Sequence, residues 1–119
     1  MSVLDKPTLE RSRPQVSVID YSVAELTDRL GALLRGKVDQ AWLFGSVPAG
    51  EAGPWSDLDL VLVTGSRRPF IERPLDFPEL FELGMPVDLI VYTAKEFAEL
   101  EQSQGGFWSG FRKSRLRIV

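Results

Sequence analysis

The sequence contains no cysteine and no histidine among its 119 residues. Without cysteine there is no disulfide, thiolate nucleophile, iron–sulfur cluster or cysteine-ligated zinc. Without histidine there is no Ser-His-Asp triad, no imidazole base and no imidazole-ligated metal. Any bound metal must therefore be held by oxygen atoms, which favours hard cations such as Mg²⁺, Mn²⁺ or Ca²⁺. Any catalytic acid or base must be a carboxylate, a lysine, a tyrosine or a bound water.

Long apolar runs and a strong excess of one charge are also missing. No apolar run approaches the roughly 20 residues that span a bilayer, and the first residues lack the apolar core of a signal peptide. The net charge of -3 gives no overall bias toward nucleic acid or an anionic membrane. We therefore expect a cytoplasmic protein without a membrane partner, and a nucleic-acid partner is not indicated. At 44% apolar content, a chain of this length forms one compact domain.

Capping signals and apolar periodicity predict an α/β fold with few strands. Ser22 with Glu25, and Thr93 with Glu96, have the spacing of capping boxes that open helices. The predicted elements are helices over 22–35 and 93–102, a short helix over 76–83, strands over 38–44, 57–63 and 86–92, and loops over 47–56 and 64–75. The strand over 57–63 is apolar enough to be buried on both faces.

The two ends of the chain show no sustained periodicity. Residues 1–20 are predicted to be a tail, with a short extended piece over 16–19. Residues 107–119 are aromatic and then basic, and no element is predicted there. The domain is therefore expected to span residues 21–119.

Asp57 and Asp59 are the first candidates for a functional site. They stand two residues apart at the start of an apolar strand, so their side chains project from the same face. Two like charges at this spacing repel each other, and a divalent cation relieves that repulsion. The alternative is that both lie in the loop before the strand, where they are solvated or cap a turn.

Asp88 is the third candidate, because it interrupts another apolar strand, PVDLIVY. If the two strands are neighbours, Asp88 can reach the face that carries Asp57 and Asp59. Three carboxylates on one face can hold one or two metal ions that polarise a phosphoryl group and activate an attacking hydroxyl. The alternative is an edge-strand aspartate that faces solvent.

Gly45 and Ser46 follow the first predicted strand. A strand that ends in Gly-Ser turns sharply and exposes backbone N–H groups, which bind anions such as phosphates. Alone, such a turn is weak evidence for a site. Its spacing is more specific, because ten residues separate Ser46 from Asp57.

Together these motifs resemble the nucleotidyltransferase family related to DNA polymerase beta, and specifically its minimal (MNT) branch. The segments LFGS and SDLDLVLV on either side of the loop also fit that pattern. The resemblance covers residues 38 to about 92. It implies a small mixed β-sheet with flanking helices, the polymerase beta-like fold.

The resemblance also implies roles for the motif residues. Gly45 and Ser46 would contact the phosphates of a nucleoside triphosphate, with ATP expected. Asp57 and Asp59 would bind Mg²⁺ or Mn²⁺, and Asp88 would complete the metal site and help to activate the attacking hydroxyl. The implied reaction transfers a nucleoside monophosphate, often AMP, to a hydroxyl with loss of pyrophosphate. Minimal members often pair with a HEPN-domain protein as its antitoxin, which implies a homo- or hetero-oligomer.

One departure from the family pattern concerns the phosphate loop. Relatives commonly carry arginine directly after Gly-Ser, whereas Val47 and Pro48 stand here, and no Lys or Arg occurs between Lys37 and Arg67. Phosphate charge must then be met by the metal or by a distant cation. The candidate cations are Arg67, Arg68, Arg112 and Lys113. This departure favours an alternative function, a catalytically weak nucleotide-binding or antitoxin-like subunit that pairs with a HEPN-type partner.

Overall fold

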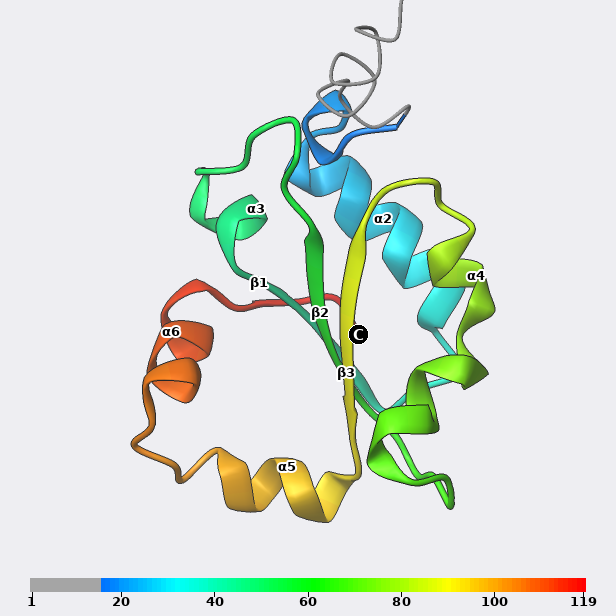
Figure 1. Ribbon diagram of the computed structural model, residues 1–119, viewed down its shortest axis with the longest axis vertical. Helices are drawn as coiled ribbons and strands as arrows, with labels where there is room; N and C mark the ends of the chain where they lie inside the picture. The colour runs from blue at the N-terminus through cyan, green and yellow to red at the C-terminus, as the bar shows by residue number, and fades with distance from the viewer. Residues whose placement is uncertain (1–15) are drawn as a thin grey trace, which may run out of the picture.

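The computed structural model describes residues 16–119, so most of the predicted N-terminal tail lies outside the described residues. In chain order the elements are η1 (Val18–Asp20), α2 (Val23–Leu34), β1 (Gln40–Phe44), α3 (Ser46–Ala49), β2 (Leu58–Val63), η2 (Phe70–Asp76), α4 (Pro78–Phe81), β3 (Val87–Tyr92), α5 (Ala94–Leu100), α6 (Gly106–Ser114) and β4 (Leu116–Arg117). Figure 1 shows the strands side by side with helices around them. None of the helices between residues 16 and 119 is long and apolar enough to cross a bilayer.

The four strands form one mixed sheet in the order β3-β2-β1-β4. β1 is antiparallel to both of its neighbours, β2 and β4, whereas β2 and β3 run parallel. This arrangement confirms the predicted small mixed sheet. It also confirms that the strands carrying Asp59 and Asp88 are neighbours.

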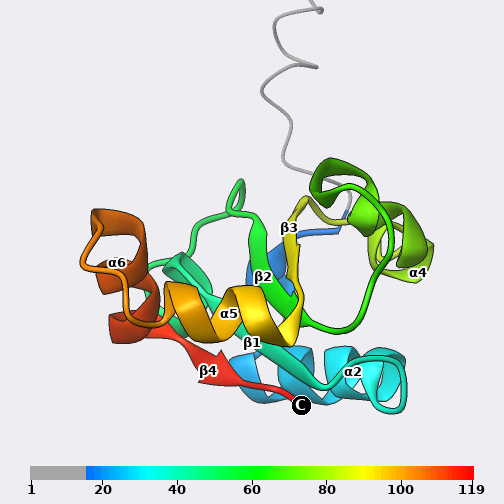
Figure 2. The same ribbon diagram turned by 90° about the horizontal axis from the view of Figure 1, so that it is seen from below.

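One face of the sheet packs against α2 and α4 (Figure 2). The buried side of α2 consists of Leu26, Leu30 and Leu34, and each such burial contributes about 1.5–3 kcal/mol. These leucines form a core with Leu80 of α4 and with alternate residues of the strands. The strand residues in this core are Ala41, Leu43, Leu58, Leu60, Leu62 and Val91.

The opposite face of the sheet is covered by α5 and α6 (Figure 2). Val61 and Val63 of β2 pack there with aromatic side chains of both helices. Phe111 of α6 lies edge-on to Phe44 of β1, with ring centroids 5.3 Å apart. The aromatic residues in this cluster are Trp42, Phe44, Tyr92, Phe97, Trp108 and Phe111. β2 is thus buried on both faces, as its sequence predicted.

The two capping boxes confirm the predicted helix starts. The Ser22 hydroxyl accepts the Glu25 N–H at 3.0 Å, and the Thr93 hydroxyl accepts the Glu96 N–H at 3.2 Å. In each box the glutamate carboxylate also accepts the N–H of the cap residue. β1 is shorter than predicted, because residue 38 forms only an isolated bridge with residue 35.

Four predictions outside the strands are wrong. Residues 16–19 are not extended, because Ser17 caps the 3₁₀ turn η1 and buries Val18. The two predicted loops contain α3 and η2. The C-terminal residues form α6 and β4, which long-range aromatic packing and strand pairing hold in place.

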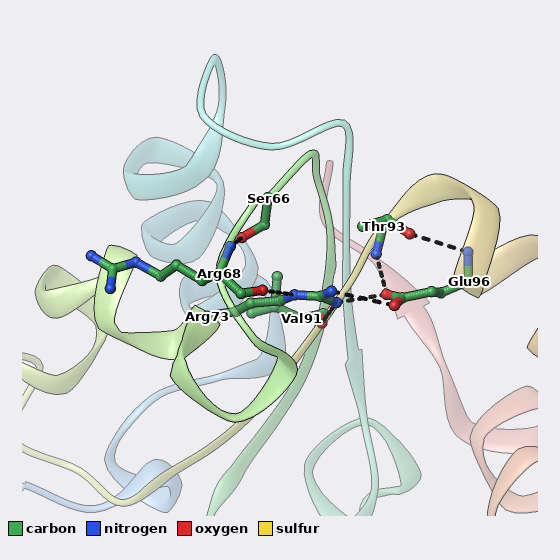
Figure 3. Close-up of polar contacts among 6 residues, drawn as sticks. All are labelled: Ser66, Arg68, Arg73, Val91, Thr93 and Glu96. Atoms are coloured by element: carbon green, nitrogen blue, oxygen red, sulfur yellow. Dashed lines mark hydrogen bonds and ion pairs between the residues drawn. The ribbon is translucent and has the colours of Figure 1, made fainter.

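Arg73 fixes the long connection between β2 and β3 (Figure 3). Its guanidinium is buried and donates to the carbonyl oxygens of Val91 at 3.1 Å and Arg68 at 3.2 Å. It also pairs with the Glu96 carboxylate at 2.6 Å. Hydrogen bonds from Arg73 and from the Thr93 N–H lower the pKa of Glu96 to about 2. One arginine therefore ties η2, the end of β3 and the start of α5 together.

Candidate active site

Asp59 stands in the middle of a row of three residues across the sheet. Its Cα pairs with that of Phe44 on β1 and with that of Asp88 on β3. Residues directly opposite on neighbouring strands project from the same face, so the row brings two carboxylates beside one aromatic ring. Asp57 comes one residue before β2 and two before Asp59. The fold thus brings all three predicted aspartates to one end of the sheet.

The electrostatics of Asp59 show that these carboxylates interact. Its pKa is raised to about 6, first by burial and then by the charges of Asp88 and Asp57. Asp57 and Asp88 themselves are exposed. Within residues 16–119, however, no three acidic side chains converge into a preassembled metal-ligand group. The site is therefore an open carboxylate cluster whose mutual repulsion is uncompensated.

Gly45 lies against the Asp59 carboxylate. Its φ of 81° and ψ of -147° are backbone angles that favour glycine. A Cβ built on Gly45 would fall far inside van der Waals contact with Asp59 Oδ2. The turn after β1 and the acidic row are thus in direct contact, and only glycine fits between them.

The short helix α3 starts immediately after this turn. The first backbone N–H groups of a helix have no intrahelical acceptor, so those of Ser46 and Val47 are available to another group. Pro48 contributes no N–H. Gly50, with a φ of 77°, ends the helix in the left-handed region. The turn at Gly45 therefore places the backbone donors of Ser46 and Val47 next to the three carboxylates.

The nucleotidyltransferase domain family matches residues 23–107, which includes every residue of this cluster. The chain belongs to this family. The match confirms the resemblance inferred from the motifs and gives the enzyme class, a nucleotidyltransferase. The comparison with curated proteins found no significant match.

Solved structures share the fold of this nucleotidyltransferase. One is described as a toxin-antitoxin with AMP-PNP. It has 21% sequence identity and a TM-score of 0.55, over 78% of this chain and 72% of that chain. Another, described as the toxin-antitoxin MntA-HpeT in a mutant form, has 18% identity and a TM-score of 0.55 over the same shares. These likenesses support the assignment of the fold.

Two polar contacts of the nucleotidyltransferase site were not predicted from the sequence. The Gly45 N–H donates to the Ser114 hydroxyl of α6 at 3.0 Å. The buried Ser17 hydroxyl donates to the carbonyl oxygen of Pro54 at 2.8 Å and so anchors the loop before Asp57. Both serines lie in segments that were predicted to be tails. No local pattern marks them, because each contact spans more than 30 residues.

The candidate phosphate-binding cations differ in their surroundings. Arg68 pairs with Asp76 at 2.8 Å, and Arg112 donates to the carbonyl oxygens of Glu101 and Ser103. Within the described part of the chain, Arg67 and Lys113 are exposed and form no ion pair. Arg67 and Arg68 follow Val63, at the end of β2 opposite to Asp59, whereas Lys113 is adjacent to Ser114, which contacts Gly45. Lys113 is therefore the best placed of the four.

Proposed function

We propose that this nucleotidyltransferase transfers AMP from ATP to a hydroxyl acceptor in a Mg²⁺-dependent reaction. The observation that carries the proposal is the row of Asp59 and Asp88, with Asp57 beside it, in contact with the Gly45 turn. The row supplies carboxylate oxygens, and the turn supplies backbone donors for a phosphate. A hydroxyl on a partner protein is among the acceptors that this site would serve.

The donor set fits the proposed metal. Asp57, Asp59 and Asp88 offer only oxygen atoms, which Mg²⁺ prefers. The pKa of Asp59 is raised first by burial and then by the charges of Asp88 and Asp57, and a bound cation would neutralise those charges. When bound, Mg²⁺ neutralises phosphate charge and polarises the phosphoryl group. These three residues are the proposed ligands.

The proposed roles of the chain's own residues follow from their places. The backbone N–H groups of Ser46 and Val47 hold the phosphates of ATP in line with the acceptor. The acceptor oxygen attacks the α-phosphorus, the bond from that phosphorus to the bridging oxygen breaks, and pyrophosphate leaves. The Asp88 carboxylate accepts the proton of the hydroxyl. Positioning and charge neutralisation supply most of the catalysis in such reactions.

The test measures transfer of label from α-labelled ATP to candidate acceptors in the presence of Mg²⁺. We expect Asp57→Asn together with Asp59→Asn to reduce transfer by at least about 100-fold, because metal stabilisation of the transition state amounts to several kcal/mol. Asp88→Asn should also reduce transfer strongly. Asp39→Asn, at an exposed aspartate outside the row, is the matched control and should retain activity. Transfer that persists in the double variant would refute the proposal.

A second candidate function is a partner-binding, antitoxin-like subunit with little turnover, paired with a HEPN-type protein. The observation that favours it is an exposed apolar surface on η2 and α4, hereafter the η2–α4 surface. Ile71 is 85% exposed and Leu75 66% exposed, and Phe70 and Phe81 are each half exposed. Exposed apolar clusters of this kind mark protein interfaces. Both functions can hold together, since an antitoxin can act by modifying its toxin.

A further inference from the structure

A single hydrogen bond connects the C-terminal helix to the phosphate loop. The Gly45 N–H donates to Ser114 Oγ at 3.0 Å, across 69 positions of sequence. The same hydroxyl donates to the Gly110 carbonyl oxygen at 3.2 Å, one turn back along α6. Because the hydroxyl proton points at Gly110, its lone pairs are left to receive the Gly45 N–H.

The pairing of β1 with β4 explains why Ser114 occupies this place. Trp42 pairs with Arg117 and Leu43 with Leu116, so the same antiparallel register, continued by two steps, puts Ser114 opposite Gly45. Ser114 is the last residue of α6 and lies outside the strand. The Ser114 hydroxyl therefore accepts the Gly45 N–H in place of the backbone carbonyl oxygen that a continued strand would have provided.

Gly45 depends on such external restraints more than another residue would. A glycine backbone has access to more conformations than any other, because glycine has no Cβ to restrict them. Here the Asp59 carboxylate lies against one side of Gly45 and the Ser114 hydroxyl holds its N–H. The conformation of Gly45 in turn sets the direction of the N–H groups of Ser46 and Val47.

Ser114 provides a rigid restraint because α6 is itself well fixed. Trp108 and Phe111 bury their rings in the aromatic cluster beneath the helix. Arg112 donates to the carbonyl oxygens of Glu101 at 3.2 Å and Ser103 at 3.0 Å. The helix therefore presents the Ser114 hydroxyl at a defined position next to the turn.

We propose that Ser114 is a positioning residue for the nucleoside triphosphate. Through the Gly45 N–H it holds the turn in the shape that directs the α3 donors at the phosphates. Docking of α6 is thereby required for phosphate binding as well as for folding. The proposal rests on the proposed function, because it concerns the same phosphate loop.

The test compares Ser114→Ala, Ser114→Thr and the control Ser109→Ala, which removes an exposed hydroxyl from the same helix. In Ser114→Ala we expect faster hydrogen exchange at the Gly45 amide and a roughly 5- to 10-fold weaker affinity for Mg²⁺-ATP, as loss of one hydrogen bond implies. Affinity for adenosine, which has no phosphate, should stay unchanged. Ser114→Thr keeps a hydroxyl and should restore both readouts, and Ser109→Ala should resemble the wild type.

Distinct outcomes would overturn the two proposals. If the wild type binds Mg²⁺-ATP and Ser114→Ala binds it equally well, the role of Ser114 is refuted and the proposed function stands. Equal losses of affinity for ATP and adenosine would reduce Ser114 to a merely structural residue and refute positioning. Unchanged exchange at the Gly45 amide would also refute it. If the wild type binds no Mg²⁺-ATP, the proposed function fails, and the triphosphate role of Ser114 fails with it.

Discussion

At the scale of the residue, the ionised form of Asp59 is destabilised by its surroundings. It is partly buried, and two further carboxylates act on it, so its pKa lies at about 6 instead of 3.8. Between about pH 4 and pH 6, Asp59 therefore binds a proton more strongly in the folded protein than in the unfolded chain. The contribution of Asp59 to stability falls as pH rises through this window. A carboxylate with such a perturbed pKa marks a candidate functional site, which agrees with the proposed cation.

Asp59→Asn should therefore stabilise the metal-free protein. The full shift corresponds to about 3 kcal/mol, and solvent screening at this partly exposed side chain reduces the expected gain to about 1 kcal/mol at pH 7. Thermal melts in a chelator should show a melting temperature about 4 °C above wild type at pH 7 and no difference at pH 4. Asp39→Asn should melt like the wild type at both pH values. A variant no more stable than wild type at pH 7 would contradict this electrostatic interpretation.

At the scale of the element, the connection of η2 and α4 depends on Arg73 more than on any cap of its own. η2 has no side-chain cap and contains Pro74, so little local preference holds it. The Arg73 contacts with Val91 and Glu96 supply that support from the neighbouring strand and helix. They keep the connection packed against β3, the strand that carries Asp88.

Arg73→Met should cost about 2–3 kcal/mol of unfolding free energy, because it removes the donor to the Val91 carbonyl oxygen and leaves the Glu96 carboxylate without its paired cation. Arg68→Met is the matched control. It breaks an exposed pair with Asp76 and should cost less than about 1 kcal/mol. Urea unfolding measures both. The stability that Glu96 contributes should also depend on pH, because its pKa is depressed in the folded protein. This contribution is fully present above about pH 4.5 and is lost as pH falls toward 2. Equal costs for the two variants would contradict the assigned role of Arg73.

The sequence predicted the elements whose signals are local. The capping boxes at Ser22 and Thr93 marked two helix starts, and predominantly apolar runs marked all three longer strands. α6 was not predicted, because Gly106 and Gly110 weaken its helix propensity and long-range contacts such as the packing of Trp108 and Phe111 stabilise it. The three aspartates were predicted because their spacing is a local signal. Ser17 and Ser114 were not, because their contacts with the site are long-range.

At the scale of the whole molecule, the acidic row and the η2–α4 surface are separate features. The row lies on the sheet face covered by α5 and α6, at the end that meets the Gly45 turn. The η2–α4 surface contains a groove of about 340 Å³ lined by Pro74, Leu75, Pro78, Phe81 and Glu82. The proposed catalysis and the proposed partner binding should therefore be removable by different substitutions.

Ile71→Lys together with Leu75→Lys should weaken binding of a HEPN-type partner at least about 10-fold, because each change removes an exposed apolar group and puts a charge that must be desolvated into the proposed interface. Co-purification and titration with the product of the neighbouring gene measure the effect. Asp57→Asn with Asp59→Asn should leave binding intact. Val23→Lys, at an apolar side chain of α2 that is 38% exposed, is the matched control. Unaltered binding by the double lysine variant would place the interface elsewhere.

The hydrogen bond between Gly45 and Ser114 also affects when the phosphate loop can complete its folding during synthesis. Its two partners are separated by 69 positions, and a ribosome adds residues at about 5–20 per second, so roughly 3–14 s pass between their synthesis. Asp59 and Asp88 are added in the course of that interval, yet until Ser114 follows them the turn has no hydroxyl to receive its N–H. The loop nearest the acidic row is thus among the last parts of the molecule to acquire its final restraint.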